Sequence, residues 1–242
     1  MQGEVQLVRE TLEGIVEPSV ATSVLFESLS RWGRGVPKGA EQVLELVQGP
    51  LRELLTHRLG PEAEPALATL VAQLTALASD DLGDFEVDIE FDDDPVGEDA
   101  AMTAQMQAVS VPVVVLVVAG YREFANRLNA AIGRERVHTI TIGDVEELRR
   151  TAFSANPQIV VVDSAQPAAI RPSDLARALK GLPDRVISFV WGEDTSYGRE
   201  LRVRADQLDA TVLYLARNEG IEPLLDLVLS RFRTSTIPPP AP

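Results

Sequence analysis

One carboxylate stands where an open parallel sheet usually places its functional side chains. Residues Ile159 to Val162 are branched and apolar without a break, and this run ends at Asp163. A short apolar run of this kind predicts a strand that is buried on both faces. Open α/β sheets bind their ligands beyond the carboxyl ends of the strands, so Asp163 is the first candidate for a functional residue.

The chain offers few other groups for catalysis or metal binding. It has no Cys, and its two His, His57 and His138, are too few for a typical His-ligated zinc cluster. Neither a G-x-G-x-x-G nor a P-loop pattern occurs, so we expect neither a dinucleotide nor a P-loop nucleotide. We expect no catalytic residues, no metal and no cofactor. One alternative is an α/β enzyme with an acidic pocket formed by Asp163, Glu193 and Asp194.

Composition and charge narrow the class of partner. The 242 residues carry a formal net charge of −15. This balance argues against a nucleic-acid or anionic membrane surface, because phosphates are met by Lys and Arg. The longest apolar run, residues 111–119, is far too short to cross a bilayer, and the first residues lack the pattern of a signal peptide. We therefore expect a soluble, cytoplasmic protein that binds neither nucleic acid nor membrane.

Residues 1–79 show the three- and four-residue apolar spacing of amphipathic helices. Pro and Gly signals divide them into four segments. Pro18 ends the first segment, and we expect Ser19 to be the N-cap of the second. Residues 49–50, Gly-Pro, should kink the third. The pattern predicts a small helical bundle, in which we see no catalytic constellation.

Residues 109–233 alternate short apolar runs with amphipathic segments. The expected strands are 111–119, 137–142, 159–162, 186–190 and 211–215, and the expected helices are 121–132, 144–153, 172–180, 197–208 and 221–232. Asp144 should cap the second of these helices. The alternation predicts an α/β fold with a five-stranded, doubly wound parallel sheet of the flavodoxin type, preceded by the all-α bundle. Residues 234–242 are Pro-rich and are predicted to be a disordered tail.

Residues 80–108 are predicted to form an acidic linker between the two parts. Without the eleven acids of residues 80–99, the net charge of −15 becomes −4, so most of the acidity belongs to this segment. Apolar residues alternate with acids here at the spacing of a strand: Phe85, Val87, Ile89 and Phe91. Three interpretations stay open. The segment lies on one of the chain's own domains, adds a strand to a partner's sheet, or is disordered.

The C-terminal region resembles the receiver domain of response regulators. The similar stretches are residues 116–120 at the exit of the first strand, residues 160–167 at the third strand and its loop, and residues 215–225 before the last helix. The resemblance implies that Asp163 occupies the phospho-acceptor position and Tyr214 that of the aromatic switch residue. The N-terminal helices resemble no family that we recognise.

The chain departs from this family at the positions that support phosphorylation. The two acids that hold Mg²⁺ in the family correspond to Ala119 and Gly120, and its Lys corresponds to Arg217. Phosphoryl transfer to a carboxylate brings negative charges together, and a divalent cation and a Lys normally offset that repulsion. We therefore interpret the region as a degenerate pseudo-receiver, in which Asp163 either hydrogen-bonds its own loop or pairs with Arg217.

These departures predict a function without catalysis. The position of the family's switch hydroxyl falls at Val190 or Trp191, neither of which has a hydroxyl. We predict a signalling adaptor, built on a phosphorylation-independent pseudo-receiver, that acts through protein–protein contacts. The alternative is an atypical response regulator that is still phosphorylated on Asp163, with the helical bundle as its output.

The predicted interaction surface combines the fourth helix, the fifth strand and the last helix. Receivers form dimers and bind partners through this face, and the resemblance places Tyr214 on it beside three basic residues: Arg199, Arg202 and Arg204. Other signalling proteins or a second copy of this chain are the expected partners, and acidic sequence such as the linker would suit the charge. The alternative is a solvated basic helix face with no partner.

Overall fold

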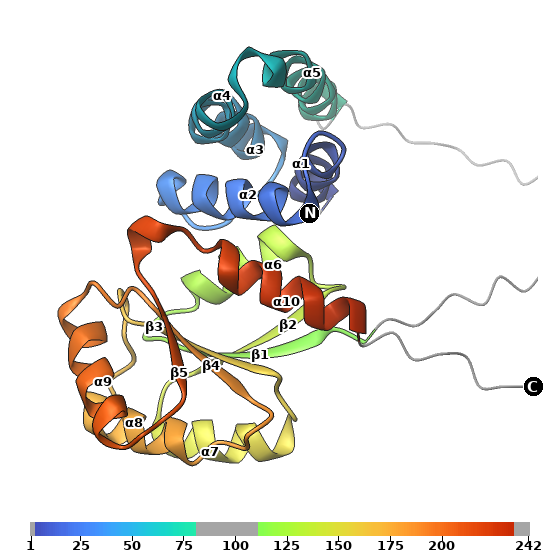
Figure 1. Cartoon of the computed structure of the whole chain (residues 1–242). Helices are drawn as coiled ribbons and strands as arrows, with labels where there is room; N and C mark the ends of the chain where they lie inside the picture. The colour runs from blue at the N-terminus through green and yellow to red at the C-terminus, as the bar shows by residue number, and fades with distance from the viewer. Residues whose placement is uncertain (1–2, 81–110, 235–242) are drawn as a thin grey trace, which may run out of the picture.

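The computed structural model describes residues 3–80 and 111–234 (Figure 1). Most of the predicted linker and nearly all of the predicted tail lie outside these ranges, including the alternating residues Phe85, Val87, Ile89 and Phe91. The described parts form layers: a stack of helices, two further helices, a parallel sheet, and three helices on the far side of the sheet (Figure 1).

Residues 3–80 are helical, as the apolar spacing predicted. The helices are α1 (Gly3–Glu13), α2 (Pro18–Trp32), α3 (Ala40–Leu46), α4 (Arg52–Leu59) and α5 (Glu64–Asp80). The prediction that Ser19 is the N-cap of α2 was wrong, because this helix begins at Pro18 with Glu17 as its N-cap. Proline suits the first helical turn, where its missing N–H would have had no partner in the helix.

The predicted kink at Gly49 and Pro50 is present. The π-helical turn η1 (Val47–Leu51) joins α3 to α4, and Gly49 within it has φ −102° and ψ −106°, which is not helical. Pro50 has no N–H to continue the hydrogen-bond ladder, so the helix divides here. The short 3₁₀ helix η2 (Gly60–Ala63) then leads into α5.

The sheet has five parallel strands in the order β2-β1-β3-β4-β5. They are β1 (Val113–Val118), β2 (Val137–Ile142), β3 (Ile159–Asp163), β4 (Ile187–Trp191) and β5 (Val212–Leu215). All of β3 is buried, which explains its unbroken apolar run. The strand order is consistent with a flavodoxin-like fold and places the carboxyl ends of all the strands at one edge.

Helices pack against both faces of this sheet. α7 (Val145–Ser154), α8 (Pro172–Lys180) and α9 (Ser196–Gln207) share one apolar cluster with one face, while α6 (Glu123–Ile132) and α10 (Glu222–Thr234) share another with the opposite face (Figure 1). Asp144 caps α7 by accepting a hydrogen bond of 2.7 Å from the N–H of Glu147, which confirms that prediction. No helix in the described ranges combines the length and the apolar character needed to cross a membrane.

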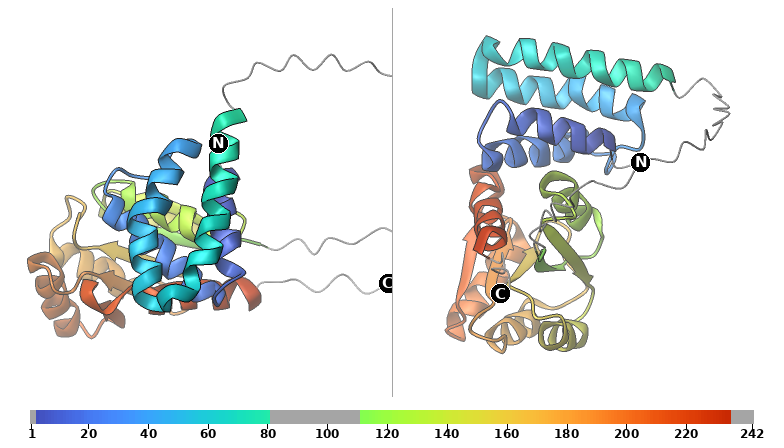
Figure 2. Two further views of the ribbon diagram at one scale, coloured as in Figure 1. Left: turned by 90° about the horizontal axis from the view of Figure 1, so that it is seen from above. Right: turned by 90° about the vertical axis from the view of Figure 1, so that its right-hand side faces the viewer.

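The N-terminal helices share a core with the α/β part. One continuous cluster of buried apolar side chains extends from α1–α5 to the face of the sheet that carries α6 and α10. α2 lies across these two helices, and Figure 2 shows the contact from two further directions. At its centre the rings of Phe26 and Phe124 meet edge to face, with centroids 5.5 Å apart. The helical stack is therefore a cover on this face of the α/β part.

Gly120 lies beneath the loop that follows β3. Its N–H donates a 2.8 Å hydrogen bond to the carbonyl of Gln166, and a Cβ at this position would lie 2.8 Å from the backbone oxygen of Pro167. The loop therefore leaves no room for any side chain at position 120.

We expect Gly120→Ala to lower the free energy of unfolding by about 1–3 kcal/mol, because the backbone must move to admit the methyl group. Urea denaturation measures this change. Gly143→Ala is the control, since a Cβ at this position after β2 would have its nearest neighbour, Oε2 of Glu147, at 3.9 Å. Equal losses of stability in the two variants would contradict this account of the loop.

Candidate functional site

A cleft of about 600 Å³ opens where α2 meets the carboxyl ends of β3 and β4. Its wall on the α2 side includes Phe26 and Arg31, and its wall on the α/β side includes Arg127, Asp163 and Arg217. The volume falls within the roughly 300–1,000 Å³ that is usual for small-molecule sites. The cleft exists only because the N-terminal helices cover this part of the sheet edge.

Asp163 lines the cleft but is almost fully buried, with 2% of its surface exposed. Its Oδ1 accepts hydrogen bonds from the N–H groups of Ala165 at 3.0 Å and Gln166 at 3.3 Å. These contacts confirm the interpretation that Asp163 hydrogen-bonds its own loop. Burial raises the pKa of this carboxyl, although the two N–H groups and the charges of Arg127 and Arg217 oppose the rise.

Arg127 of α6 was missed by the sequence analysis. Its guanidinium carbon lies 5.5 Å from the centre of the Phe26 ring. Its Nε is buried and has no hydrogen-bond partner among the described residues. Burial lowers the pKa of this guanidinium, and the negative charge of Asp163 acts in the opposite direction. The sequence did contain a signal for the position of Arg127. It follows the inward-facing Phe124 by three residues, so it lies beside the buried side of its helix.

Arg217 enters the cleft from η3 (Arg217–Glu219), the 3₁₀ turn after β5, and Arg31 enters it from the end of α2. The predicted pair between Arg217 and Asp163 is not formed, because no Arg217 nitrogen lies within 4.0 Å of the Asp163 carboxylate. The two residues nevertheless share the cleft, and their charges influence each other. Three arginines from three elements thus line the same cleft as a carboxylate that stays with its own loop.

Val190 and Tyr214 lie on the other side of the sheet from the cleft. They are register partners in β4 and β5, and both pack in the cluster that contains α7, α8 and α9. The Tyr214 ring lies under the Arg202 guanidinium at 5.1 Å, and burial raises the pKa of Tyr214 to about 12. The cleft is instead lined by Trp191, the next residue along β4, because successive side chains of a strand alternate between the two faces.

A chain of hydroxyl groups fixes the loops beside the cleft. The N–H of Gly198 donates to Oγ1 of Thr195 at 2.9 Å, and that hydroxyl donates to Oγ of Ser164 at 3.0 Å. Ser164 in turn donates to the carbonyls of Trp191 and Gly192. Both hydroxyl protons are engaged in these bonds, so this network holds the β3 and β4 loops together.

Glu193 and Asp194 do not face the cleft. Both carboxylate oxygens of Glu193 accept hydrogen bonds from Arg202, at 2.9 and 3.0 Å, and Asp194 accepts one from the N–H of Arg217 at 3.2 Å. They therefore do not form an acidic pocket with Asp163 in this cleft. In residues 3–80 and 111–234, no group of three or more His, Asp or Glu side chains is placed to hold a metal ion.

The basic residues predicted for the interaction surface bind to their own neighbours. Arg199 donates to the carbonyl of Asp194, and Arg204 donates to the side chain of Gln207. With Arg202 bound to Glu193, each of the three arginines has a local partner. The more distinctive feature of α9 and β5 is a set of exposed apolar side chains: Val203, Leu208 and Leu213.

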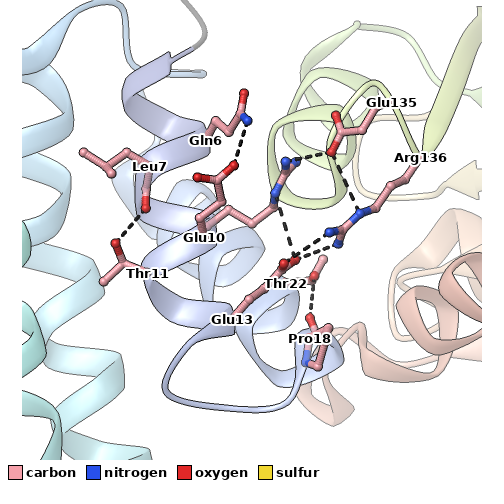
Figure 3. Close-up of polar contacts among 10 residues, drawn as sticks. Gln6, Leu7, Glu10, Thr11, Glu13, Pro18, Thr22, Glu135 and Arg136 are labelled. Atoms are coloured by element: carbon pink, nitrogen blue, oxygen red, sulfur yellow. Dashed lines mark hydrogen bonds and ion pairs between the residues drawn. The ribbon is translucent and has the colours of Figure 1, made fainter. Parts of the chain in front are cut away.

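Ion pairs join the first helix to the α/β part beside α6 (Figure 3). Arg136 donates to both carboxylate oxygens of Glu13, at 2.6 and 3.1 Å. Arg9, which is 5% exposed, donates to Glu135 at 2.7 Å. The hydrogen bond that Arg136 donates to Glu13 is the largest influence on the pKa of Arg136, and it raises that pKa. The two-pronged, largely buried pair between Arg136 and Glu13 holds the two parts together more firmly than an exposed single contact would.

A second ionic contact joins the helices on the other side of the interface. Arg58 of α4 lies 2.9 Å from Glu27 of α2 and 3.0 Å from Glu222 of α10. Burial opposes ionisation of Glu222, but the Ser23 hydroxyl, a backbone N–H and Arg58 together lower its pKa. α2 is thus tied to α10 as well as packed on α6.

A scan of this sequence against models of known protein families finds no match, and a search of curated proteins finds none either. The resemblance to receiver domains, with everything that it implies, therefore stays a prediction.

Tyr214→Phe tests the environment of the switch-like position. The Tyr214 hydroxyl is buried without a partner in the described ranges, so we expect its loss to change stability by less than about 1 kcal/mol at neutral pH. A tyrosine with a pKa of 10.0 when unfolded and about 12 when folded loses stability as pH rises between these values, because the unfolded chain releases its proton first.

The variant should therefore lose less stability than the parent in this alkaline range, measured by urea denaturation at a series of pH values. Tyr197→Phe is the matched control, because its hydroxyl donates a 2.9 Å hydrogen bond to the carbonyl of Ile170. That variant should lose about 1 kcal/mol already at neutral pH. A comparable loss in Tyr214→Phe would show that its hydroxyl has a partner after all.

Proposed function

We propose that this protein is a non-enzymatic signalling adaptor whose α/β part is a doubly wound, receiver-like unit that works without phosphorylation. The strand order β2-β1-β3-β4-β5 and the helices on both faces of the sheet support the fold assignment. The observation that carries the proposal is the surroundings of Asp163, where arginines and backbone N–H groups take the place of further acids.

The exit of β1 is poorly suited to the metal ion that phosphoryl transfer to Asp163 would need. Mg²⁺ prefers oxygen ligands in a near-octahedral arrangement, and Ala119 and Gly120 supply no side-chain oxygen. The loop above Gly120 also fills the space that a longer side chain would occupy, since a Cβ there meets the Pro167 backbone at 2.8 Å. This edge of the sheet is therefore shaped for a role other than accepting a phosphoryl group.

The surface formed by α9 and β5 is the proposed docking face for a signalling protein or a second copy of the chain. β5 is an edge strand, since the sheet order places it beside β4 alone. Leu213 on β5 is 49% exposed and Val203 on α9 is 54% exposed. An exposed strand edge with apolar side chains beside it favours contact with another protein.

The second candidate is an atypical response regulator phosphorylated on Asp163. One observation favours it: the charges of Arg127 and Arg217 act on this carboxylate without neutralising it in an ion pair. Guanidinium groups bind phosphate well, so the same arginines would stabilise a phosphorylated Asp163. The two candidates differ in whether the carboxylate is modified at all.

Incubation of the full chain with acetyl phosphate and Mg²⁺, followed by intact-mass spectrometry, separates the two. We expect no gain of a phosphoryl group, because the carboxylate is buried and Ala119 and Gly120 offer no acid to hold the cation beside it. Asp163→Asn is the control. A mass gain in the parent that disappears in Asp163→Asn would overturn the adaptor proposal and establish the response regulator.

A further inference from the structure

The three arginines of the cleft are its most unusual feature. Arg31 comes from α2, Arg127 from α6 and Arg217 from the turn after β5, and all three line one cavity. None of them forms an ion pair within 4.0 Å with a described residue. The whole chain has 22 basic and 37 acidic residues, so three arginines that line one cavity without an ion pair are unusual for its composition. The charges of Asp163 and Glu123 act on Arg127 without forming such a pair.

The acids of the cleft do not neutralise this charge. Glu27 is held by Arg58 at 2.9 Å, and Oδ1 of Asp163 is bound by two backbone N–H groups of its own loop. Arg58 is shared with Glu222, so it offsets Glu27 only in part. The lining therefore holds three arginines against two acids, Glu27 and Asp163, and keeps a net positive charge. An anion that enters the cleft would meet a site whose cations are already assembled.

Two buried polar atoms of the cleft also lack partners among the described residues. They are Nε of Arg127, which can only donate, and Oε1 of Gln166, which can only accept. Buried polar groups are normally satisfied, so these two residues are incompletely bonded within the protein. Both atoms are shielded from solvent, so a ligand in the cleft would reach them only if these side chains moved.

The size of the cleft indicates a ligand larger than an inorganic anion. The volume is about 600 Å³, and the half-buried ring of Trp191 and the side chain of Ile221 give the wall an apolar section. Guanidinium groups match phosphate through paired N–H donors. The combination of cations and a flat aromatic ring suits a molecule with a phosphate group and an organic part.

We propose that the cleft reversibly binds a phosphorylated small molecule. Its phosphate group contacts Arg31, Arg127 and Arg217, and its organic part lies against Trp191. Because Arg31 belongs to α2 and the other two arginines belong to the α/β part, the bound molecule holds these parts together. This site goes beyond the proposed function, since docking on α9 and β5 needs no small ligand.

Sodium pyrophosphate is the probe for the phosphate subsite, with EDTA present and the ionic strength held constant. In the full chain carrying Trp32→Phe, Trp191 is the only tryptophan and its fluorescence reports on the cleft. We expect a saturable change that corresponds to one bound ion, matched by calorimetry of the parent chain. Arg31→Ala and Arg217→Ala should each weaken binding about tenfold or more, and both side chains are exposed, so the fold should persist.

Arg34→Ala and Arg199→Ala are the control variants, because these arginines do not line the cleft. Binding in the controls should equal that of the parent chain. Absence of a saturable response to pyrophosphate, or an equal response in Arg31→Ala and Arg217→Ala, would overturn the proposal. So would an equal response to sodium sulfate, which would show unselective attraction of anions. Reversible binding leaves the protein mass unchanged, so this result is independent of phosphorylation on Asp163.

Discussion

The packing of α2 on α6 and α10 is the contact on which the rest of this structure depends. The Phe26 ring lies against Phe124 of α6, and the Arg127 guanidinium lies on the same ring. Arg58 adds an ionic contact to both α2 and α10. Contacts of this kind are stronger where the surroundings are apolar, and the continuous apolar cluster lies directly beneath them. The cover of helices then creates a cleft at an edge of the sheet that would otherwise be open.

The electrostatics of that edge follow from the same contact. Asp163 ends a strand that is buried throughout, so its carboxylate is desolvated, and its loop compensates with two N–H groups. Arg127 is desolvated by the helix that covers it, and it stays charged beside an aromatic ring and a nearby carboxylate. The result is a cationic cleft in an acidic chain. A docking role for α9 and β5 and a ligand role for the cleft therefore use separate surfaces of one unit.

The sequence predicted the elements well because their signals are local. The unbroken apolar run before Asp163 indicated the buried strand, and the Asp144 cap and the kink at Gly49 and Pro50 depend on neighbouring residues alone. The cleft could not be predicted, because it arises from contacts between residues about one hundred positions apart, such as Phe26 and Phe124. The prediction of Ser19 as the N-cap of α2 was wrong, because the proline before it already starts the helix.

The most direct test of the shared core is whether the helical stack and the α/β part unfold together. The chain has two tryptophans, Trp32 in α2 and Trp191 in β4, so Trp191→Phe and Trp32→Phe each leave one reporter, in a different part. Urea unfolding followed by tryptophan fluorescence should give a single transition with the same slope in each variant, after correction for any change in stability. A transition of the Trp32 reporter at clearly lower urea, with the Trp191 reporter still native, would show that the helices are a separate domain and that the cleft is not a fixed part of the molecule.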